Sequence, residues 1–490
     1  MSQKSTIVIG KNDHVRTAQT FLKTRKKEIL TYCGDLFEYA GQQWEIVRPE
    51  DIRAAYWRFA SQAKDAETGD RCMPTKHTAG NFLEALQAIT NESGRQSIPF
   101  WRNGRDELPA SEFVAFRNGL VHLPTRTVLR HTPDYFNLHA LGYDFDPSAP
   151  EPHAFFRTIN SMWPDDPESR DCLAEIIGYL IAGATDLQKI FGFFGAKRSG
   201  KGTLVRVLQQ LAGPEACAGP TLSSLAGQFG LQNLIDKKLA VISDARLGGK
   251  VDKSAIAERL LAISGEDMIS VPRKFRDDWC GQMSTRFLII SNEVLRLDDI
   301  SGALASRFIV LHFPKSFYGK EDPALTSKLL KELPGILNWA LKGYDRLRKR
   351  GYFIQPETGK AVLEELEALS SPISTFIKDR CRVAPGAQVE CSELYQAWRD
   401  WCETQGREHP GTQQTFGRDI KAALPEVRTK QVMQTGERFR VYDGISLGNL
   451  HSITRDEVNC SVNKNGDLYR NSGECNADSR VKSSATEVLI

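Results

Sequence analysis

The chain has 490 residues, of which 41% are hydrophobic and 26% are charged, and its formal net charge is only +3. That length exceeds one compact core and predicts about two to four domains. The small net charge excludes a uniformly basic protein, so any attraction to nucleic acid must come from a local patch. The ten cysteines occur singly, which indicates neither a zinc site nor a disulfide framework. Without a secretory signal or an apolar run of about 20 residues, we expect a cytoplasmic protein with no membrane segment.

Residues 1–150 predict an N-terminal α+β domain. The segment Asp35–Val47 reads as two strands joined at Gly41. The dipeptide Asn118-Gly119 favours the positive φ angles of a tight turn and predicts a hairpin over Phe113–Leu123. No paired-carboxylate or zinc pattern occurs in this region.

Residues 151–188 predict a helical lead-in to the next domain. Their apolar positions follow helical spacing and predict one buried helix face, formed by Leu173, Ile176, Ile177, Leu180 and Ile181. Residues 189–350 then alternate between strand and helix patterns and end in a helical extension over Pro323–Arg350. This alternation predicts an α/β domain with a parallel sheet.

The strongest chemical signal is a glycine-bounded loop between an apolar strand and a helix. The loop comprises Gly195, Ala196, Lys197, Arg198, Ser199, Gly200, Lys201, Gly202 and Thr203. Backbone N–H groups of such a loop and the helix N-terminus bind phosphates, and Lys201 is expected to reach the outer ones. Gly202 stands where the pattern usually has Ser or Thr. We therefore expect Thr203 to be the phosphate or magnesium ligand.

A P-loop needs an acidic residue at the tip of a neighbouring strand, to hold magnesium or polarise water. The apolar run before Ser243 delivers Asp244 to such a strand end. Asp244 is the only carboxylate there. Whether it acts as metal ligand, general base or both stays open, and Glu293 is a candidate to share the work.

Two further polar residues follow apolar runs. Asn292 ends the strand pattern from Arg286 and is suited to orient the attacking water, although Asn is also a common turn residue. Arg307 lies between a short helix and a new strand, where it can reach the γ-phosphate of a neighbouring subunit. The alternative for Arg307 is a surface salt bridge.

The order and spacing of these segments resemble the phage and plasmid primase–helicase family. Its motor belongs to the superfamily 3 helicases of the AAA+ clade, of phage satellite and poxvirus type. The resemblance extends to Phe116-Arg-Asn-Gly-Leu-Val and to Pro334-Gly-Ile-Leu-Asn-Trp339-Ala. It implies an α/β P-loop AAA+ core that hydrolyses ATP with Mg²⁺. By resemblance, Gly195–Thr203 is the Walker A loop, Asp244 the Walker B acid, Asn292 the sensor and Arg307 the arginine finger acting in trans.

The same resemblance implies a hexameric ring that moves 3′-to-5′ on single-stranded DNA. The partners expected from it are single-stranded and forked DNA, further copies of the chain, a separate primase and replication proteins of a bacterial host. The family also has a basic hairpin that touches DNA in the pore. Here Met268–Trp279 occupies that place, and Arg273, Lys274 and Arg276 are its expected DNA contacts, with Lys274 foremost. The alternative is a solvated charged turn.

The C-terminal third predicts a linker and a small domain. Residues 351–371 read as a linker with a helix in it. Residues 372–447 predict a winged-helix-like domain from three helices, followed by two strands around Thr435-Gly436; the helices are Ile373–Cys381, Ser392–Gln405 and Gln413–Ala423. DNA binding and protein docking both remain open for that domain. Residues 448–490 are rich in Asn, Ser, Asp and Gly and predict a disordered tail.

Two other functions fit parts of the sequence. The run Gly-Lys-Gly-Thr also resembles the loop of nucleoside monophosphate kinases, although those enzymes begin with it. A non-catalytic replication initiator would use the C-terminal domain alone. The order of motifs favours an ATP-dependent DNA helicase of a phage, plasmid or other mobile element.

Overall fold

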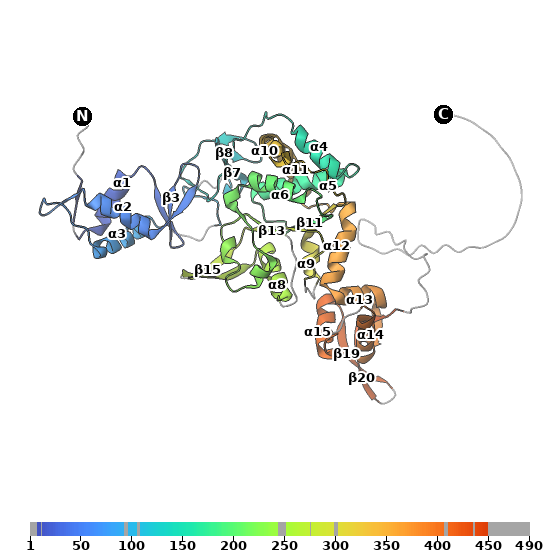
Figure 1. Cartoon of the computed structure of the whole chain (residues 1–490). Helices are drawn as coiled ribbons and strands as arrows, with labels where there is room; N and C mark the ends of the chain where they lie inside the picture. The colour runs from blue at the N-terminus through green and yellow to red at the C-terminus, as the bar shows by residue number, and fades with distance from the viewer. Residues whose placement is uncertain are drawn as a thin grey trace, which may run out of the picture. The chain divides into compact units, whose positions relative to one another are not determined.

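The structure is a computed structural model that describes residues 7–10, 12–92, 97–104, 108–243, 251–274, 276–297, 302–405, 410–434 and 437–448. The chain forms two compact units. The first comprises residues 1–375 together with 418–424, and the second comprises residues 376–417 and 425–490. Figure 1 labels their elements. The predicted disordered tail lies almost entirely outside the described residues, which end at 448.

The N-terminal part of the first unit mixes short strands and helices. Its helices are α1 (His14–Thr24), α2 (Pro49–Ala60), α3 (Lys76–Ile89) and the 3₁₀ turn η1 (Ala110–Glu112). Its strands are β1 (Val8–Ile9), β2 (Ile29–Tyr32), β3 (Asp35–Tyr39), β4 (Trp44–Val47), β5 (Lys64–Asp65), β6 (Phe100–Trp101), β7 (Phe113–Phe116), β8 (Gly119–His122), β9 (Val128–Leu129) and β10 (Tyr135–Phe136). Both predicted strand pairs are confirmed, since β3 pairs with β4 and β7 pairs with β8.

Several hydrophobic clusters organise the described residues of this N-terminal part, and another cluster joins it to the domain after it. Helices α1, α2 and α3 pack around Phe82, whereas β2, β3 and β4 pack on an aromatic cluster around Phe136. The β7–β8 hairpin instead contributes Val114, Phe116 and Val121 to the same buried cluster as the large sheet of the next domain. The predicted domain boundary at residue 150 therefore cuts through a continuous core.

The next domain is built on a five-stranded parallel sheet. Its strands run in the order β12-β13-β16-β11-β17 and comprise β11 (Ile190–Gly195), β12 (Cys217–Ala218), β13 (Leu239–Ser243), β16 (Arg286–Ser291) and β17 (Phe308–Phe313). A separate antiparallel pair consists of β14 (Met268–Arg273) and β15 (Arg276–Gln282). The helices are α4 (His153–Met162), α5 (Pro167–Ala182), α6 (Lys201–Ala212), α7 (Leu222–Ala226), α8 (Lys253–Ser264), α9 (Ala303–Arg307), α10 (Leu325–Leu330), α11 (Leu333–Arg350) and α12 (Glu357–Ser370), with 3₁₀ turns η2 (Pro214–Ala216) and η3 (Gln232–Leu234).

The sheet is buried on both faces, as the continuous apolar run of β11 requires. Phe191 and Phe193 point into a cluster with α4, α5, α6 and α11, whereas Ile190 and Phe194 point into a cluster with α7, α8, α9 and α12. In Figure 1, α4, α5, α6 and α11 lie above β11 and β13, whereas α8 and α9 lie below them. Parallel strands covered on both faces read as unbroken hydrophobic segments, because successive side chains point to alternate faces. This mixed α/β arrangement is consistent with a P-loop core.

Helix α5 is buried on more than the single predicted face. Every residue from Cys172 to Ala182 is buried. The reason is α11, which crosses α5 so closely that a Cβ on Gly178 would lie 2.4 Å from the carbonyl oxygen of Ala340, and one on Gly343 would lie 2.6 Å from the carbonyl carbon of Ala174. The five residues of the predicted face are thus buried as expected, and α11 covers a further face that the sequence pattern did not predict.

The predicted helical extension over Pro323–Arg350 is confirmed and consists of two helices, α10 and α11. One prediction for the residues after it needs correction. The segment 351–371 is not a linker, because α12 packs on the sheet domain with Leu366 1% exposed. Just before α12, the Gln355 side chain donates to the carbonyl oxygen of Val310 and accepts from its N–H, at 2.8 and 2.9 Å. Gln355 thereby provides hydrogen-bond partners for a backbone N–H and a carbonyl oxygen of the edge strand β17, which would otherwise be unpaired.

The second unit contains most of the predicted winged-helix-like domain. Its elements are α13 (Pro372–Arg380, which begins in the first unit), β18 (Cys381–Glu390), α14 (Cys391–Thr404), the start of α15 (Gln413–Ala423), β19 (Arg428–Gln434) and β20 (Glu437–Leu447). The three strands form one antiparallel sheet in the order β18-β20-β19. Trp398, Trp401 and Phe416 pack around Phe376. The three helices and the hairpin are found where predicted, whereas β18 was missed. DNA binding or protein docking by this domain stays a prediction.

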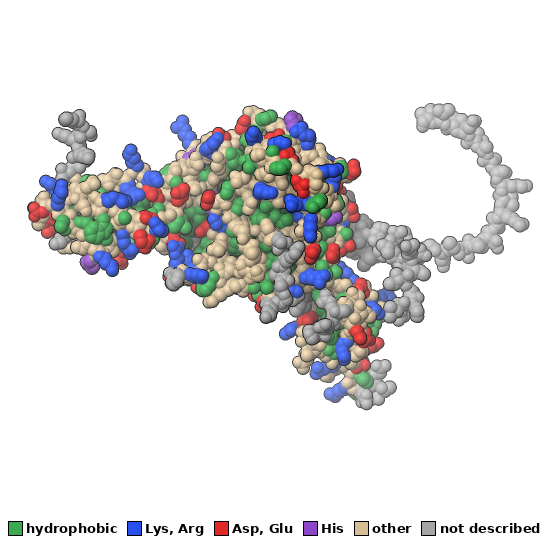
Figure 2. Space-filling view, in the orientation of Figure 1, with side chains coloured by type: hydrophobic (Ala, Val, Ile, Leu, Met, Phe, Trp, Pro, Cys, Tyr) green, Lys and Arg blue, Asp and Glu red, His purple; other side chains and the backbone are tan. Residues whose placement is uncertain are grey.

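The surface carries both charges without strong segregation. On the face shown in Figure 2, Lys and Arg side chains are interspersed with Asp and Glu, as the small net charge suggests. Within the described residues, no helix combines the length and apolar composition needed to cross a membrane.

We expect Gly178→Ala to lower the free energy of unfolding by about 1–3 kcal/mol, since overpacking of a close helix crossing costs that much. The matched control is Gly80→Ala in α3, where an added Cβ meets nothing within 4 Å. That control should be neutral or stabilising by up to about 1 kcal/mol. Thermal and urea unfolding measure both changes, and equal stability of the two variants would contradict the close crossing.

Candidate nucleotide-binding site

The glycine-rich loop joins β11 to α6, as predicted. Two of its glycines have positive φ angles, 138° at Gly195 and 89° at Gly200. A Cβ on Gly195 would lie 2.2 Å from the carbonyl oxygen of Phe313, and a Cβ on Gly200 would lie 2.2 Å from Cε of Met162. Both positions therefore require glycine, for backbone conformation and for space. The loop backbone is held between β17 and α4.

The Lys201 side chain lies inside the loop rather than in solvent, with the residue 6% exposed. Its Nζ donates to the carbonyl oxygens of Gly195 (2.9 Å) and Ala196 (2.7 Å), to Oγ of Ser199 (3.0 Å) and to Oδ1 of Asn292 (3.2 Å). Burial lowers the pKa of Lys201 from 10.5 to about 8, because the charged form loses hydration. The ammonium is thus poised at the phosphate-binding loop.

Asn292 meets Lys201 because of strand order. Strands β11 and β16 are parallel neighbours with Phe194 in register with Ser291, so the loop and Asn292 leave the same edge of the sheet. Ligands of open parallel sheets bind at that carboxyl edge. Asp244 lies outside the described residues, and the last described residue before it, Ser243, is in register with Ile290 of β16. Glu293 is exposed, and its N–H donates to Oγ of Ser291.

A cavity of about 810 Å³ opens at this edge, within the range of small-molecule sites. The predicted residues Arg198, Ser199, Gly200, Lys201, Gly202, Thr203 and Asn292 line it. Its lining in the described part of the chain includes six Lys and Arg side chains but only two acidic ones, which suits a polyanion. Sequence reasoning missed the opposite wall, formed by α4 and residues 317–328, because no motif marks it.

Arg307 lies at the amino ends of the strands, opposite to the ends that carry the phosphate loop and Asn292. Phe308, the next residue, is in register with Ile190 at the start of β11. Arg307 is therefore six residues from the level of Gly195 along the strands, about 20 Å at roughly 3.3 Å per residue. Its Nη1 donates to Oγ of Ser264 at 3.2 Å. Arg307 therefore does not belong to the phosphate site of its own subunit.

The predicted basic hairpin is formed by β14 and β15, and its three cations are in different environments. Arg273 and Arg276 both face Asp35 of β3, with N–O separations of 3.7 and 3.1 Å. Lys274 has no such carboxylate contact among the described residues, and its Nζ lies over the Phe229 ring, 5.5 Å from the centroid. Lys274 is thus the hairpin cation whose charge is least neutralised within the chain.

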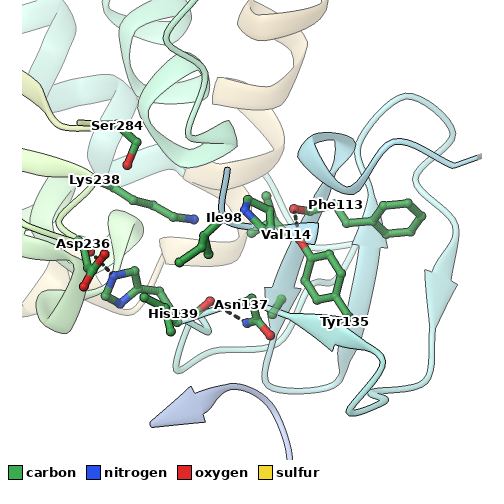
Figure 3. Close-up of a pocket in the computed structure, with 12 residues that line it drawn as sticks. Ile98, Phe113, Val114, Tyr135, Asn137, His139, Asp236, Lys238 and Ser284 are labelled. Atoms are coloured by element: carbon green, nitrogen blue, oxygen red, sulfur yellow. Dashed lines mark hydrogen bonds between the residues drawn. The ribbon is translucent and has the colours of Figure 1, made fainter. Parts of the chain in front are cut away.

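A second cavity lies between residues 98–139 and residues 236–284 but measures only about 60 Å³ (Figure 3). Nε2–H of His139 donates to the carbonyl oxygen of Asp236, and burial lowers the pKa of His139 to about 4. Burial also lowers the pKa of Lys238 to about 8. This volume is far below that of ordinary ligand pockets, and no residue of the phosphate loop lines it. We assign the nucleotide site to the larger cavity.

Comparison with known proteins agrees with the motif order. Residues 18–164 match the family described as D5 N terminal like, and residues 193–307 match DUF5906, a family of unknown function. Together the two matches span more than half of the chain. The chain belongs to the D5-type primase–helicase family. This confirms the resemblance to phage and plasmid primase–helicases, and the first match continues through α4 into the sheet domain.

The fold of this D5-type chain is similar to that of a solved region of a protein named NrS-1. "The apo structure of NrS-1 C terminal region (305-718)" aligns at 14% identity with a TM-score of 0.51, covering 89% of this chain and 100% of that one. Two A-form apo structures of the same region align at 13% and 14% identity, each with a TM-score of 0.49, and cover 88% and 87% of this chain and 99% and 98% of theirs. The first of these likenesses shows a shared fold.

The lowered pKa of Lys201 predicts a pH dependence of ATP affinity. The phosphates attract the charged ammonium, which is lost as pH rises through about 8. Affinity should therefore be constant below that pH and fall by up to about tenfold per unit above it. The control is Lys201→Arg, whose side chain stays charged, so any binding that it retains should not weaken between pH 7 and about 9.5. Calorimetric titration measures this, and equal wild-type affinity at the two ends of that range would contradict the assigned role.

Proposed function

We propose that the chain is an ATP-dependent DNA helicase motor that works as a ring, in the replication of a phage, plasmid or other mobile element. The observation that carries the proposal is the meeting of Lys201 Nζ and Asn292 Oδ1 at 3.2 Å, at the mouth of the large cationic cavity. A phosphate-binding lysine beside a polar side chain from the neighbouring strand is the arrangement that nucleotide hydrolysis requires.

Each residue has a distinct task in this proposal. The loop N–H groups and Lys201 bind the β- and γ-phosphates. Thr203 and Asp244 would hold Mg²⁺ together with the phosphates, and the ion would supply positive charge that stabilises the transition state. Asn292 orients the attacking water, and Asp244, alone or with Glu293, accepts its proton.

The site is completed by a neighbouring subunit. Arg307 lies too far from its own phosphate loop to contact the γ-phosphate, but at an edge from which it can serve an adjacent copy. An arginine acting in trans stabilises the charge of the transition state and contributes strongly to turnover. A site made of the phosphate loop of one subunit and Arg307 of the next supports a ring assembly. The family resemblance leads us to expect six subunits.

Mixing two inactive variants tests the shared site. Lys201→Ala lacks a working phosphate loop but keeps its Arg307, whereas Arg307→Ala has the opposite defect. Each variant alone should be nearly inactive, whereas random mixing at equal amounts should restore about a quarter of the wild-type ATPase rate, the fraction of interfaces that are intact. Subunit exchange is verified by native mass spectrometry. No recovery in verified mixed rings would contradict a site shared between subunits.

The hairpin of β14 and β15 is proposed to contact DNA through Lys274. Arg273 and Arg276 are both paired with Asp35, whereas Lys274 lies over the Phe229 ring. Lys274 is therefore the hairpin cation most available to bind a DNA phosphate.

Lys274→Ala should therefore reduce DNA-stimulated ATPase and unwinding but spare basal ATPase. The loss of one phosphate contact should lower the slope of log affinity against log salt by about one. Lys76→Ala, an exposed lysine at the start of α3, is the control and should change neither quantity. Fluorescence anisotropy with single-stranded DNA gives the slope. A slope equal to wild type together with normal unwinding would make the hairpin a solvated turn.

A further inference from the structure

The large cavity extends well beyond the phosphate loop. Past Lys201 it continues between α4 and residues 317–328, where Ala154, Thr158, Ser161, Met162, Phe317, Pro323 and Leu325 line it. The same wall also carries polar and charged side chains, and it contains one aromatic ring, that of Phe317; the polar and charged residues beyond Thr158 and Ser161 are Arg157, Lys320, Glu321, Asp322, Thr326 and Lys328. Neither the motifs nor the family matches assign a role to it.

Phe317 is fixed to the phosphate loop through its own backbone. Its N–H donates to the carbonyl oxygen of Arg198 at 2.9 Å, and Oγ of the preceding Ser316 donates to the carbonyl oxygen of Lys197 at 2.8 Å. The strand before it is bound in the same way, since the N–H of Ala196 donates to the carbonyl oxygen of Phe313 at 2.9 Å. These hydrogen bonds therefore fix the backbone of Phe317 relative to the phosphate loop.

The ring is half-buried, and Nζ of Lys315 lies over it, 5.5 Å from the centroid. Thr158 and Ser161 line the same cavity, and their hydroxyls each donate to a carbonyl oxygen of α4, at 2.8 and 2.7 Å. A hydroxyl that donates in this way keeps lone pairs that can accept a further hydrogen bond. A cavity lined by both an aromatic ring and polar acceptors suits a planar group with N–H donors along its edge.

We propose that this part of the cavity binds the nucleoside of the bound nucleotide and that Phe317 is the platform on which its base stacks. The inference rests on the proposed nucleotide site and adds the residue that distinguishes a nucleoside triphosphate from a bare polyphosphate. Base–aromatic stacking contributes about 1–3 kcal/mol per base, enough to dominate recognition of the nucleoside. Because every base has a π-face, Phe317 selects for a nucleoside rather than for one particular base.

The adjacent Tyr318 provides a matched control. It is 80% exposed and does not line the cavity. Replacing it removes an aromatic ring from the same segment without touching the site.

Calorimetric binding of two probes to the full chain, ATP and inorganic tripolyphosphate, tests the proposal. Phe317→Ala should weaken ATP binding about tenfold or more and leave tripolyphosphate binding unchanged. Phe317→Trp should restore ATP binding, and Tyr318→Ala should bind both probes like wild type. Circular dichroism and thermal unfolding establish that each variant is folded.

Two results would overturn the inference while leaving the nucleotide site intact. One is unchanged ATP affinity in Phe317→Ala when Lys201→Ala has lost it. The other is an equal loss for both probes in folded Phe317→Ala, which would mean that the ring only shapes the phosphate loop. If wild-type protein binds neither probe, the proposed function itself fails.

Discussion

The site depends on a buried positive charge. Lys201 is nearly inaccessible, and the four groups that accept hydrogen bonds from it are carbonyl, hydroxyl and amide oxygens, none of which carries a charge. Such groups satisfy the N–H donors of the ammonium but do not neutralise it, and burial lowers its pKa to about 8. A bound polyanion would supply the opposite charge. The two glycines, Met162 and the end of β17 all serve to keep the loop closed around this ammonium.

The strand order places the candidate site residues at two opposite ends of the strands. Because β11 lies between β16 and β17, its carboxyl end brings the phosphate loop next to Asn292, while the amino end of β17 carries Arg307 to the opposite edge. The phosphate loop and Asn292 thus lie at one end of the strands, whereas Arg307 lies at the other end. The N-terminal part reaches the same domain through Asp35, which faces two of the three hairpin cations.

Local pattern was enough to predict the phosphate loop, the two N-terminal strand pairs and the helices of the second unit, because each depends on residues close in sequence. What it missed depends on tertiary contact. The role of α4 follows from Met162 packing on Gly200, and that of α12 from Leu366 and Gln355. Strand β18 escaped notice because Pro385 and Gly386 interrupt it where its pairing shifts register. Phe317 lies beyond every motif and is brought to the loop only by folding.

The central claim is that nucleotide hydrolysis in this chain is coupled to DNA. The most direct test is the ATPase rate of the wild-type chain with and without single-stranded DNA, measured together with the mass of the assembly in the presence of ATP. We expect single-stranded DNA to raise the rate several-fold and ATP to favour a ring of several subunits. A rate that is unaffected by DNA, in a chain that stays monomeric with ATP, would contradict the helicase assignment.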